Sequence, residues 1–215
     1  MSRRVALIQV LGAVAYGELK AYEGLRAEAK ETGDPDERRL LRTFAAQELR
    51  HHKGFVSRLE ALGADPERAM RPYRAPLDHY HGGVASGPVE EAVRSYLGEG
   101  IADDLLRWLR TVVDPETATF IDGVLQDEEQ HEGHATEELR ALLAAHGGRQ
   151  DAARAANRML AHMALSGRRG AAPLLAFLQL GRTSELLARL IGGFARRLRA
   201  IGVNPATAAL AGVTL

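Results

Sequence analysis

Two Glu-x-x-His pairs are the residues of this sequence best placed to do chemistry. They are Glu48–His51 and Glu128–His131. Residues three apart on a helix lie on one face, so each pair can present a carboxylate and an imidazole to a common ion. A single pair of this kind would mean little, because a chain rich in glutamate with eight histidines is expected to contain one by chance. Two pairs need independent support from the rest of the sequence.

That support comes from a single glutamate that precedes each pair and directly follows a glycine. The first lies 30 residues before Glu48 and the second 29 residues before Glu128, so the two halves repeat with an offset of 80–81 residues. Two single glutamates and two Glu-x-x-His pairs form the ligand set of helical bundles that bind two iron or two manganese ions. The spacing therefore predicts a two-metal site, with oxygen-rich ligation that suits iron and its reaction with dioxygen. Its ligands would be Glu18, Glu48, His51, Glu99, Glu128 and His131.

The ligands interrupt helical stripes that are otherwise apolar. Glu18 follows Leu11 and Val14 on its face, and Glu128 follows Ile121 and Val124. Because an unpaired buried carboxylate costs several kcal/mol, carboxylates pointing into one core require cations among them. The two-fold repeat assigns Glu18 and His51 to one metal, and Glu99 and His131 to the other. Glu48 and Glu128 would then bridge the two ions.

Three more side chains stand one helical turn from the single glutamates. Asp103 is either a replacement ligand or an acceptor for the N–H of a ligand imidazole, and we favour the second role. Tyr22 and Tyr96 are interpreted as core aromatics, with a redox or substrate-facing role as the alternative. The candidate residues around the ligands are therefore Asp103, Tyr22 and Tyr96.

Long amphipathic helices are expected to carry these residues. Three Asp-Pro-acid sequences, beginning at Asp34, Asp65 and Asp114, are typical helix starts, because Asp caps free N–H groups and Pro suits the first turn. Glycines at 33, 63, 147–148 and 202 are typical of helix ends. We predict four helices at about 3–32, 35–62, 88–112 and 115–146, with residues 63–87 as a long connection.

Two helical hairpins joined by one long crossover are an arrangement of the ferritin-like kind. The predicted fold class is therefore all-α, a ferritin-like four-helix bundle with C-terminal helices at about 150–166, 172–180 and 183–201. Nothing in the sequence alternates with the period of a strand.

Charge divides the chain into two zones. Residues 1–148 hold 18 basic and 26 acidic residues, whereas residues 149–215 hold ten arginines and two acids. We predict a two-metal bundle at 1–148 and a basic helical extension at 149–215 that packs on it. The extension either binds a polyanion or pairs with the acidic body.

Composition removes several classes of protein. The absence of cysteine excludes disulfide frameworks, thiol catalysis, iron–sulfur clusters and Cys-ligated zinc. No run approaches the ~18 apolar residues of a membrane span, so no membrane partner is expected. The first residues are basic and then apolar, like a secretion signal. The helical pattern of apolar residues, however, continues without a break through Glu18 to Leu25, so we expect a cytoplasmic protein.

The chain resembles the ferritin-like hydroxylase family of the tRNA 2-methylthio-N6-isopentenyladenosine hydroxylase, in the branch common in high-GC Gram-positive bacteria. The resemblance covers roughly residues 5–203. It is carried by Leu11-Gly-Ala-Val-Ala-Tyr-Gly-Glu18, the Glu48/His51 pair, Tyr96-Leu-Gly-Glu-Gly-Ile-Ala-Asp103, the segment from Val124 to His131, parts of the crossover (Ala69-Met70 and Pro76-Leu77-Asp78), and Arg196-Arg197-Leu198 to Gly202.

This resemblance implies a di-iron monooxygenase that hydroxylates an unactivated C–H bond with dioxygen. It assigns the same six ligands, with manganese as the alternative metal. The implied partners are an electron-donating reductase or ferredoxin and a tRNA that carries the modified nucleoside. The arginine-rich C-terminal region would bind this tRNA. A homodimer is the assembly considered.

Two alternatives from other classes stay open. The first is a ferroxidase or iron-binding protein without an organic substrate. The second is a helical interaction protein whose metal site is vestigial. The arginines of 149–215 also have a purely structural interpretation, because this zone contains only Phe177 and Phe194 as aromatic platforms for bases.

Overall fold

The structure, a computed structural model, describes residues 1–83, 85–146, 148–167 and 172–206, with the side chains of 146, 164–167 and 172–175 left aside. Within these ranges all regular structure is helical and no strand is present, which confirms the all-α prediction. Also within these ranges, no helix combines the length and the apolar character that crossing a bilayer requires. The helices are α1 (Arg3–Glu31), α2 (Pro35–Ala61), α3 (Pro66–His81), α4 (Pro88–Leu109), α5 (Pro115–His146), α6 (Arg149–Gly167), α7 (Ala172–Leu180) and α8 (Thr183–Ala200).

The helix ends follow the capping residues of the sequence. Asp34 accepts hydrogen bonds from the backbone N–H groups of residues 36 and 37, and Asp65 accepts one from Arg68. The Asp114 carboxylate accepts one from Thr117 at 3.0 Å. Gly63 and Gly202 have φ values of 65° and 76°, the left-handed conformation that ends a helix at low steric cost.

Helix α3 corrects the prediction that residues 63–87 form a connection. Its cap and first turn are the Asp-Pro-acid sequence, but Pro72 and Pro76 lie inside it, where proline normally disfavours helix. Packing explains the difference: Met70 and Tyr73 are buried, and α3 lies across α1 where Gly12 meets Ala69. A side chain at Gly12 would place its Cβ 2.5 Å from the Ala69 carbonyl oxygen, so only glycine permits this approach.

The chain divides into two compact units. The first holds Met1–Gly82, Val113–Phe120 and Ser166–Gly181, and the second holds Gly83–Val112, Ile121–Leu165 and Arg182–Leu215. Both units draw on residues 1–148 and on residues 149–215. The division into a bundle and an extension at residue 148 stays a prediction.

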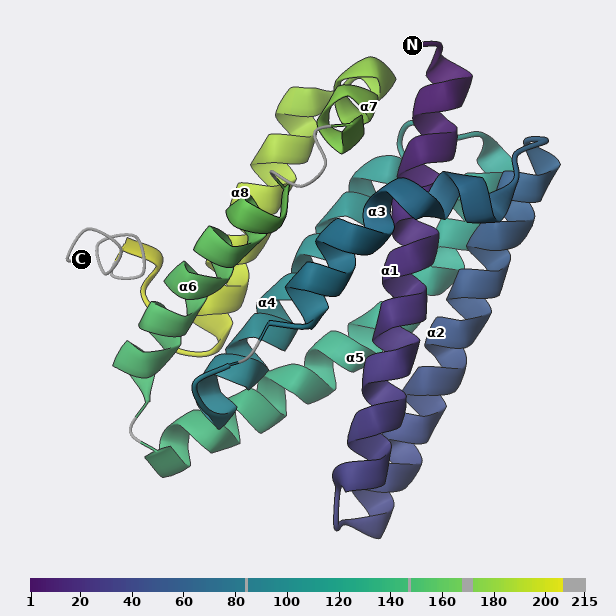
Figure 1. Cartoon of the computed structure of the whole chain (residues 1–215). Coiled ribbons are helices and arrows are strands. Elements are labelled where there is room, and N and C mark those ends of the chain that lie inside the picture. Colours follow the sequence, from purple (N-terminus) through teal and green to yellow (C-terminus); the bar gives the residue numbers. More distant parts are fainter. Residues whose placement is uncertain (84, 147, 168–171, 207–215) are drawn as a thin grey trace. The chain divides into compact units, whose positions relative to one another are not determined.

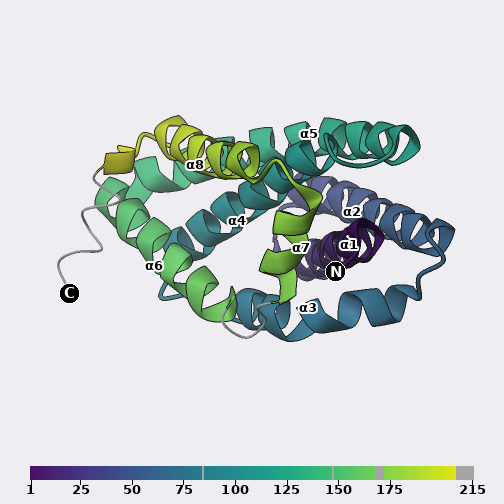
Figure 2. The ribbon, with the colours of Figure 1, turned by 90° about the horizontal axis from the view of Figure 1, so that it is seen from above.

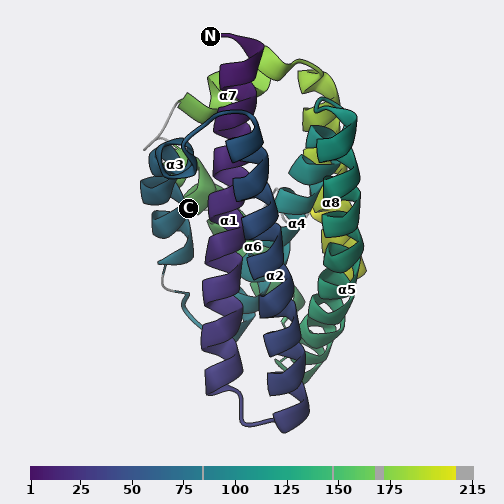
Figure 3. The ribbon, with the colours of Figure 1, turned by 90° about the vertical axis from the view of Figure 1, so that its right-hand side faces the viewer.

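The first unit is built on the hairpin of α1 and α2, whose helices run side by side (Figures 1 and 3). Helix α7 packs on α1, and the Arg3 guanidinium donates to the Leu180 carbonyl at 2.8 Å. The first turns of α5 belong here too, because the rings of Phe55 and Phe120 meet edge to face at 4.9 Å. The unit therefore fixes α1 and α2 from several sides.

The second unit contains α4, most of α5, α6 and α8. Helix α8 packs along α4, as the view from above shows (Figure 2). The Trp108 indole donates to the Arg182 carbonyl at 3.2 Å, and Arg140 of α5 donates to the Ala200 carbonyl at 2.7 Å. Both ends of α8 are thus tied to the helices that carry Glu99, Glu128 and His131.

Candidate metal centre

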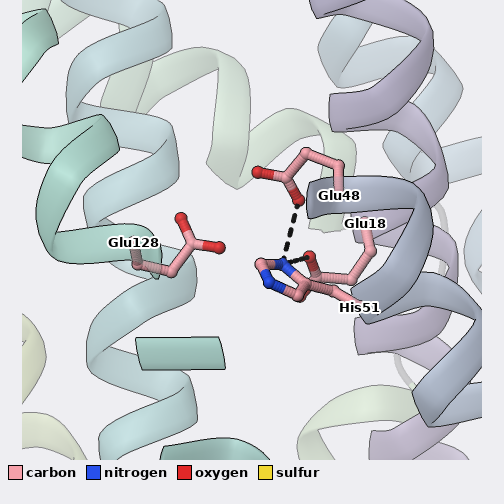
Figure 4. A group of neighbouring side chains, drawn as sticks. All are labelled: Glu18, Glu48, His51 and Glu128. Atoms are coloured by element: carbon pink, nitrogen blue, oxygen red, sulfur yellow. Dashed lines mark ion pairs between the residues drawn. The ribbon is translucent and has the colours of Figure 1, made fainter. Parts of the chain in front are cut away.

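Three of the six expected ligands meet in the first unit. Glu18 comes from α1, and Glu48 and His51 come from α2; their exposed fractions are 8%, 4% and 1%. The Nδ1 atom of His51 lies 3.4 Å from Glu18 Oε2 and 3.6 Å from Glu48 Oε2 (Figure 4). One ligand atom from each of the three lies within 4.8 Å of the others, which is compatible with a shared ion.

The local sequence explains why these polar groups point inward. On α2, Glu48 and His51 stand between the buried residues Phe44 and Phe55, one turn away on either side. On α1, Glu18 follows the buried Val14 by one turn. The apolar stripe buries the helix face, and the polar residues on that face are carried into the interior with it.

The second unit supplies another Glu-x-x-His group. Glu128 and His131 of α5 are buried, and His131 Nδ1 lies 3.3 Å from Glu128 Oε2. Glu99 of α4 differs from its counterpart Glu18, because it is exposed and accepts a hydrogen bond from Ser95 Oγ at 2.9 Å. The structure thus places five of the six expected ligands in the interior and one at the surface.

A small cavity of about 10 Å³ lies beside this second group. A water molecule needs roughly 10–15 Å³ by the same measure, so the cavity has room for about one. Carboxylates dominate its walls, and Glu99 reaches it although it is exposed. The lining residues are Tyr96, Glu99, Gly100, Asp103, Glu128, His131 and Glu132.

Asp103, expected near the ligands, is buried and lines this cavity. Its Oδ2 lies 3.6 Å from the Arg197 guanidinium and 3.9 Å from that of Arg107. Burial, together with the negative charge of Glu128, raises the pKa of Asp103 to about 8, although Arg197 opposes the shift. Its role as acceptor for an imidazole stays a prediction.

The two tyrosines occupy different surroundings. Tyr96 is buried, lines the cavity and accepts a hydrogen bond from Thr136 Oγ1 at 3.1 Å. Tyr22 is half-buried, and its hydroxyl accepts a hydrogen bond from the exposed Arg26 at 2.9 Å. Only Tyr96 therefore matches the core position expected for both.

Arg197 is a residue of the site that sequence reasoning missed. It is 1% exposed, and its Nη1 donates to Asp104 Oδ2 at 2.7 Å. Its Nε lies 3.1 Å from Glu132 Oε1. The sequence offered one sign of this role. Arg197 lies on the apolar face of the predicted helix 183–201 and is followed by Leu198, although it is far from the ligands in sequence.

Other arginines of the basic zone form ion pairs inside the second unit. Arg158 donates twice to the Glu90 carboxylate, at 2.7 and 3.0 Å, and Arg189 pairs with Glu185 at 3.0 Å. The pair with Arg158 lowers the pKa of Glu90 to about 2. These contacts favour the structural interpretation of the zone. Arg168 and Arg169 lie outside the described residues.

The donor set of the first unit fits a metal ion such as iron or manganese. Two carboxylates and one imidazole are buried together, and even a protonated His51 would offset only one of the two negative charges within the group. Carboxylate oxygen with imidazole nitrogen is the ligation that divalent iron and manganese accept. Glu128 and His131 repeat the same pairing in the second unit.

Comparison with known proteins identifies the fold. A solved structure from Synechococcus, described as protein 19 with aldehyde deformylating oxidase activity, is similar with a TM-score of 0.79 and 21% sequence identity. The match covers 99% of this chain and 97% of that one, and confirms the ferritin-like fold class. No protein of curated function matches the sequence significantly. Residues 2–190 match the family model described as ferritin-like domain, actinomycetes, and the chain therefore belongs to this family of ferritin-like proteins.

Proposed function

We propose that the chain is a non-haem oxidoreductase that holds two iron ions and uses dioxygen, with manganese as the alternative metal. The observation that carries the proposal is the buried group of Glu18, Glu48 and His51, whose ligand atoms lie within 4.8 Å of one another. The repeat in sequence extends the ligand set to the second unit. The ions would be held by Glu18, Glu48, His51, Glu99, Glu128 and His131.

Bound iron would supply the electron-transfer chemistry that lets dioxygen react with a closed-shell molecule. The chain's own residues prepare the surroundings. The first group lies on a helix face between the buried rings of Phe44 and Phe55. The carboxylates and Tyr96 around the second group offer polar contacts to a water-sized molecule. Glu99 is the expected ligand that lies at the surface, where it accepts a hydrogen bond from Ser95.

For the reaction we propose monooxygenation, the hydroxylation of a C–H bond. The resemblance to ferritin-like hydroxylases supports this proposal. The Synechococcus protein of similar fold is described as having an oxidase activity, which is a different reaction. Hydroxylation would require electrons from a reductase or ferredoxin. A cytoplasmic location and a homodimer stay predictions.

A modified tRNA nucleoside is the substrate that the resemblance suggests. The ten arginines of residues 149–215 support it, whereas the ion pairs of Arg158, Arg189 and Arg197 weaken it. Mass spectrometry of tRNA nucleosides from cells that lack the protein tests it. Loss of a hydroxylated adenosine supports a tRNA substrate, and an unchanged nucleoside pool excludes it.

Metal content and oxygen consumption test the proposed function itself. Purified protein is expected to contain about two iron ions per chain and to consume dioxygen after reduction. Glu48→Ala and His131→Ala are each expected to lower the iron content below two ions per chain and to abolish oxygen consumption, because each removes a buried ligand. Glu129→Ala is the matched control, since Glu129 is the exposed neighbour of Glu128. Full iron content in either ligand variant would overturn the proposal, and so would wild-type protein that takes up no iron.

A ferroxidase is the second candidate, and the size of the cavity favours it. The space beside Glu128 and His131 has room for about one water molecule. A ferroxidase is expected to assemble into a multimeric shell and to form iron mineral when Fe(II) is added in air. Oxidation of Fe(II) without mineral or shell would remove the storage role.

A further inference from the structure

Arg197 has the least exposed charged side chain of the second unit among the described residues, and it lies beside the candidate ligands. It enters from α8 and reaches carboxylates on both α4 and α5. Burying a guanidinium is costly unless its N–H groups and its charge are matched. The burial of Arg197 therefore requires an explanation.

Two glycines make the space for this side chain. A Cβ at Gly100 of α4 would collide with the middle of the Arg197 side chain. A Cβ at Gly193 of α8 would collide with the Asp104 carboxylate. The two helices thus approach closely at the point where the guanidinium passes between them, and larger side chains would close the gap.

The guanidinium meets three carboxylates. Nη1 donates to Asp104 Oδ2 at 2.7 Å, and Nη2 lies 3.6 Å from Asp103 Oδ2. Nε lies 3.1 Å from Glu132 Oε1, and Nη2 lies 3.4 Å from Glu132 Oε2. The rigid fork of an arginine can serve several carboxylates in fixed directions, which the single charge of a lysine cannot.

Two of these carboxylates connect Arg197 to the candidate ligands. Asp103 stands one turn after Glu99 on α4, and Glu132 one turn after Glu128 on α5. Both line the same small cavity as Glu128 and His131. Without the guanidinium, the negative charges of Glu99, Glu128 and Glu132 around this cavity would repel one another, and Asp103 would lose its nearer cation.

The first unit has no need of such an arginine. The repeat offset of 80–81 residues places Tyr22 and His52 at the positions of Asp103 and Glu132. Neither carries a carboxylate, and the His52 ring forms a hydrogen bond with the Ala15 carbonyl at 2.7 Å. Any effect of Arg197 is therefore expected in the second group of ligands.

We propose that Arg197 is a positioning residue for the second group, holding Asp103 and Glu132 so that Glu99, Glu128 and His131 bind their metal ion tightly. This inference rests on the proposed function. It makes the two metal positions unequal, because only the second depends on an arginine supplied by α8.

Manganese titration of the full chain tests the proposal, with bound Mn(II) followed by the loss of the free-ion electron paramagnetic resonance signal. Two backgrounds separate the positions: His51→Ala leaves the second group, and His131→Ala leaves the first. Adding Arg197→Met is expected to weaken binding about 10-fold or more in the His51→Ala background, the usual effect of removing a partner behind a ligand. In the His131→Ala background the change is expected to stay within about 2-fold.

Two variants serve as controls. Arg197→Lys is expected to recover part of the affinity, because it keeps the charge and loses the fork. Arg196→Met should change nothing, since Arg196 is 57% exposed and lies 3.8 Å from Asp104. Equal weakening in both backgrounds would indicate a general loss of structure and overturn the proposal, as would unchanged binding in both.

Gly100→Ala keeps the test decisive if Arg197→Met does not fold. The added methyl group displaces the guanidinium without removing a charge, and the same selective weakening is expected. Folding of each variant is checked by circular dichroism. If wild-type protein binds no Mn(II) or Fe(II), the proposed function fails; if it binds two ions and the variants bind as tightly, only the role of Arg197 fails.

Discussion

The first unit flanks its carboxylates with apolar side chains, whereas the second unit adds further charges to its own. Along α1 and α2 the buried neighbours of the ligands are Val14, Phe44 and Phe55. In the second unit Asp103, Glu132 and Arg197 lie beside the ligands, whereas the repeat offset places Tyr22 and His52 at the positions of Asp103 and Glu132 in the first unit. Equal spacing of ligands in sequence therefore coexists with two different environments.

The contrast extends to how the helices are held together. In the first unit α3 meets α1 through a contact between Gly12 and the backbone of Ala69. In the second unit α8 meets α4 where Gly100 makes room for a charged side chain. Glycine permits close approach in both units, but backbone fills the gap in one and an ion-pair network fills it in the other.

The largest expected effect concerns the apolar contact of the first unit. Gly12→Ala should destabilise the protein by about 1–3 kcal/mol, because the new methyl group overlaps a backbone carbonyl that cannot move aside. Gly24→Ala is the control on the same helix, since nothing lies within 4 Å of its Cβ position. That control should be neutral or stabilising by up to about 1 kcal/mol, as alanine favours helix. Urea unfolding measures both, and equal stability of the two variants would contradict the close contact.

The next prediction concerns pH and the charged environment of the second unit. The pKa of Asp103 is raised to about 8 in the folded chain from an ordinary value of 3.8. Between these values the folded state binds more protons than the unfolded state, so the stability of the metal-free protein should fall as pH rises from about 4 to 8. Asp103→Asn should flatten this fall. If the free energies of unfolding of the wild-type and Asp103→Asn proteins fall equally with pH, Asp103 is not the cause.

The smallest effect is expected at the edge of the second unit. Arg158 holds the pKa of Glu90 at about 2, below its ordinary 4.5, so the pair stabilises the fold above about pH 4.5 and loses this effect as pH falls towards 2. Glu90→Gln should cost at most about 1 kcal/mol at neutral pH, because the Arg158 side chain is half-exposed and water screens the pair. Glu137→Gln, at an exposed glutamate of α5, is the control. A cost at pH 7 that persists unchanged at pH 3 would contradict the role of the charge.

Helical periodicity determined much of the structure from sequence alone. The apolar stripes located α1, α2, α4 and α5 within a few residues. Asp-Pro-acid starts marked α2 and α5, and glycine ends marked α1, α2 and α5, because caps and stripes are local properties. The same periodicity identified Glu18, Glu48 and His51 as polar residues on buried faces, and the structure brings these three together. Their binding of metal stays a prediction.

Only the tertiary structure decided the rest. Helix α3 forms despite Pro72 and Pro76 because Met70 and Tyr73 find a partner in α1, a contact that no local rule contains. Glu99 shares its spacing with Glu18 yet is exposed. Arg197 lies 93 residues from Asp104 in sequence, so their ion pair could not be predicted without knowing that α8 packs against α4. Spacing along one helix determines which residues share a face, but which charges meet across helices depends on how those helices pack.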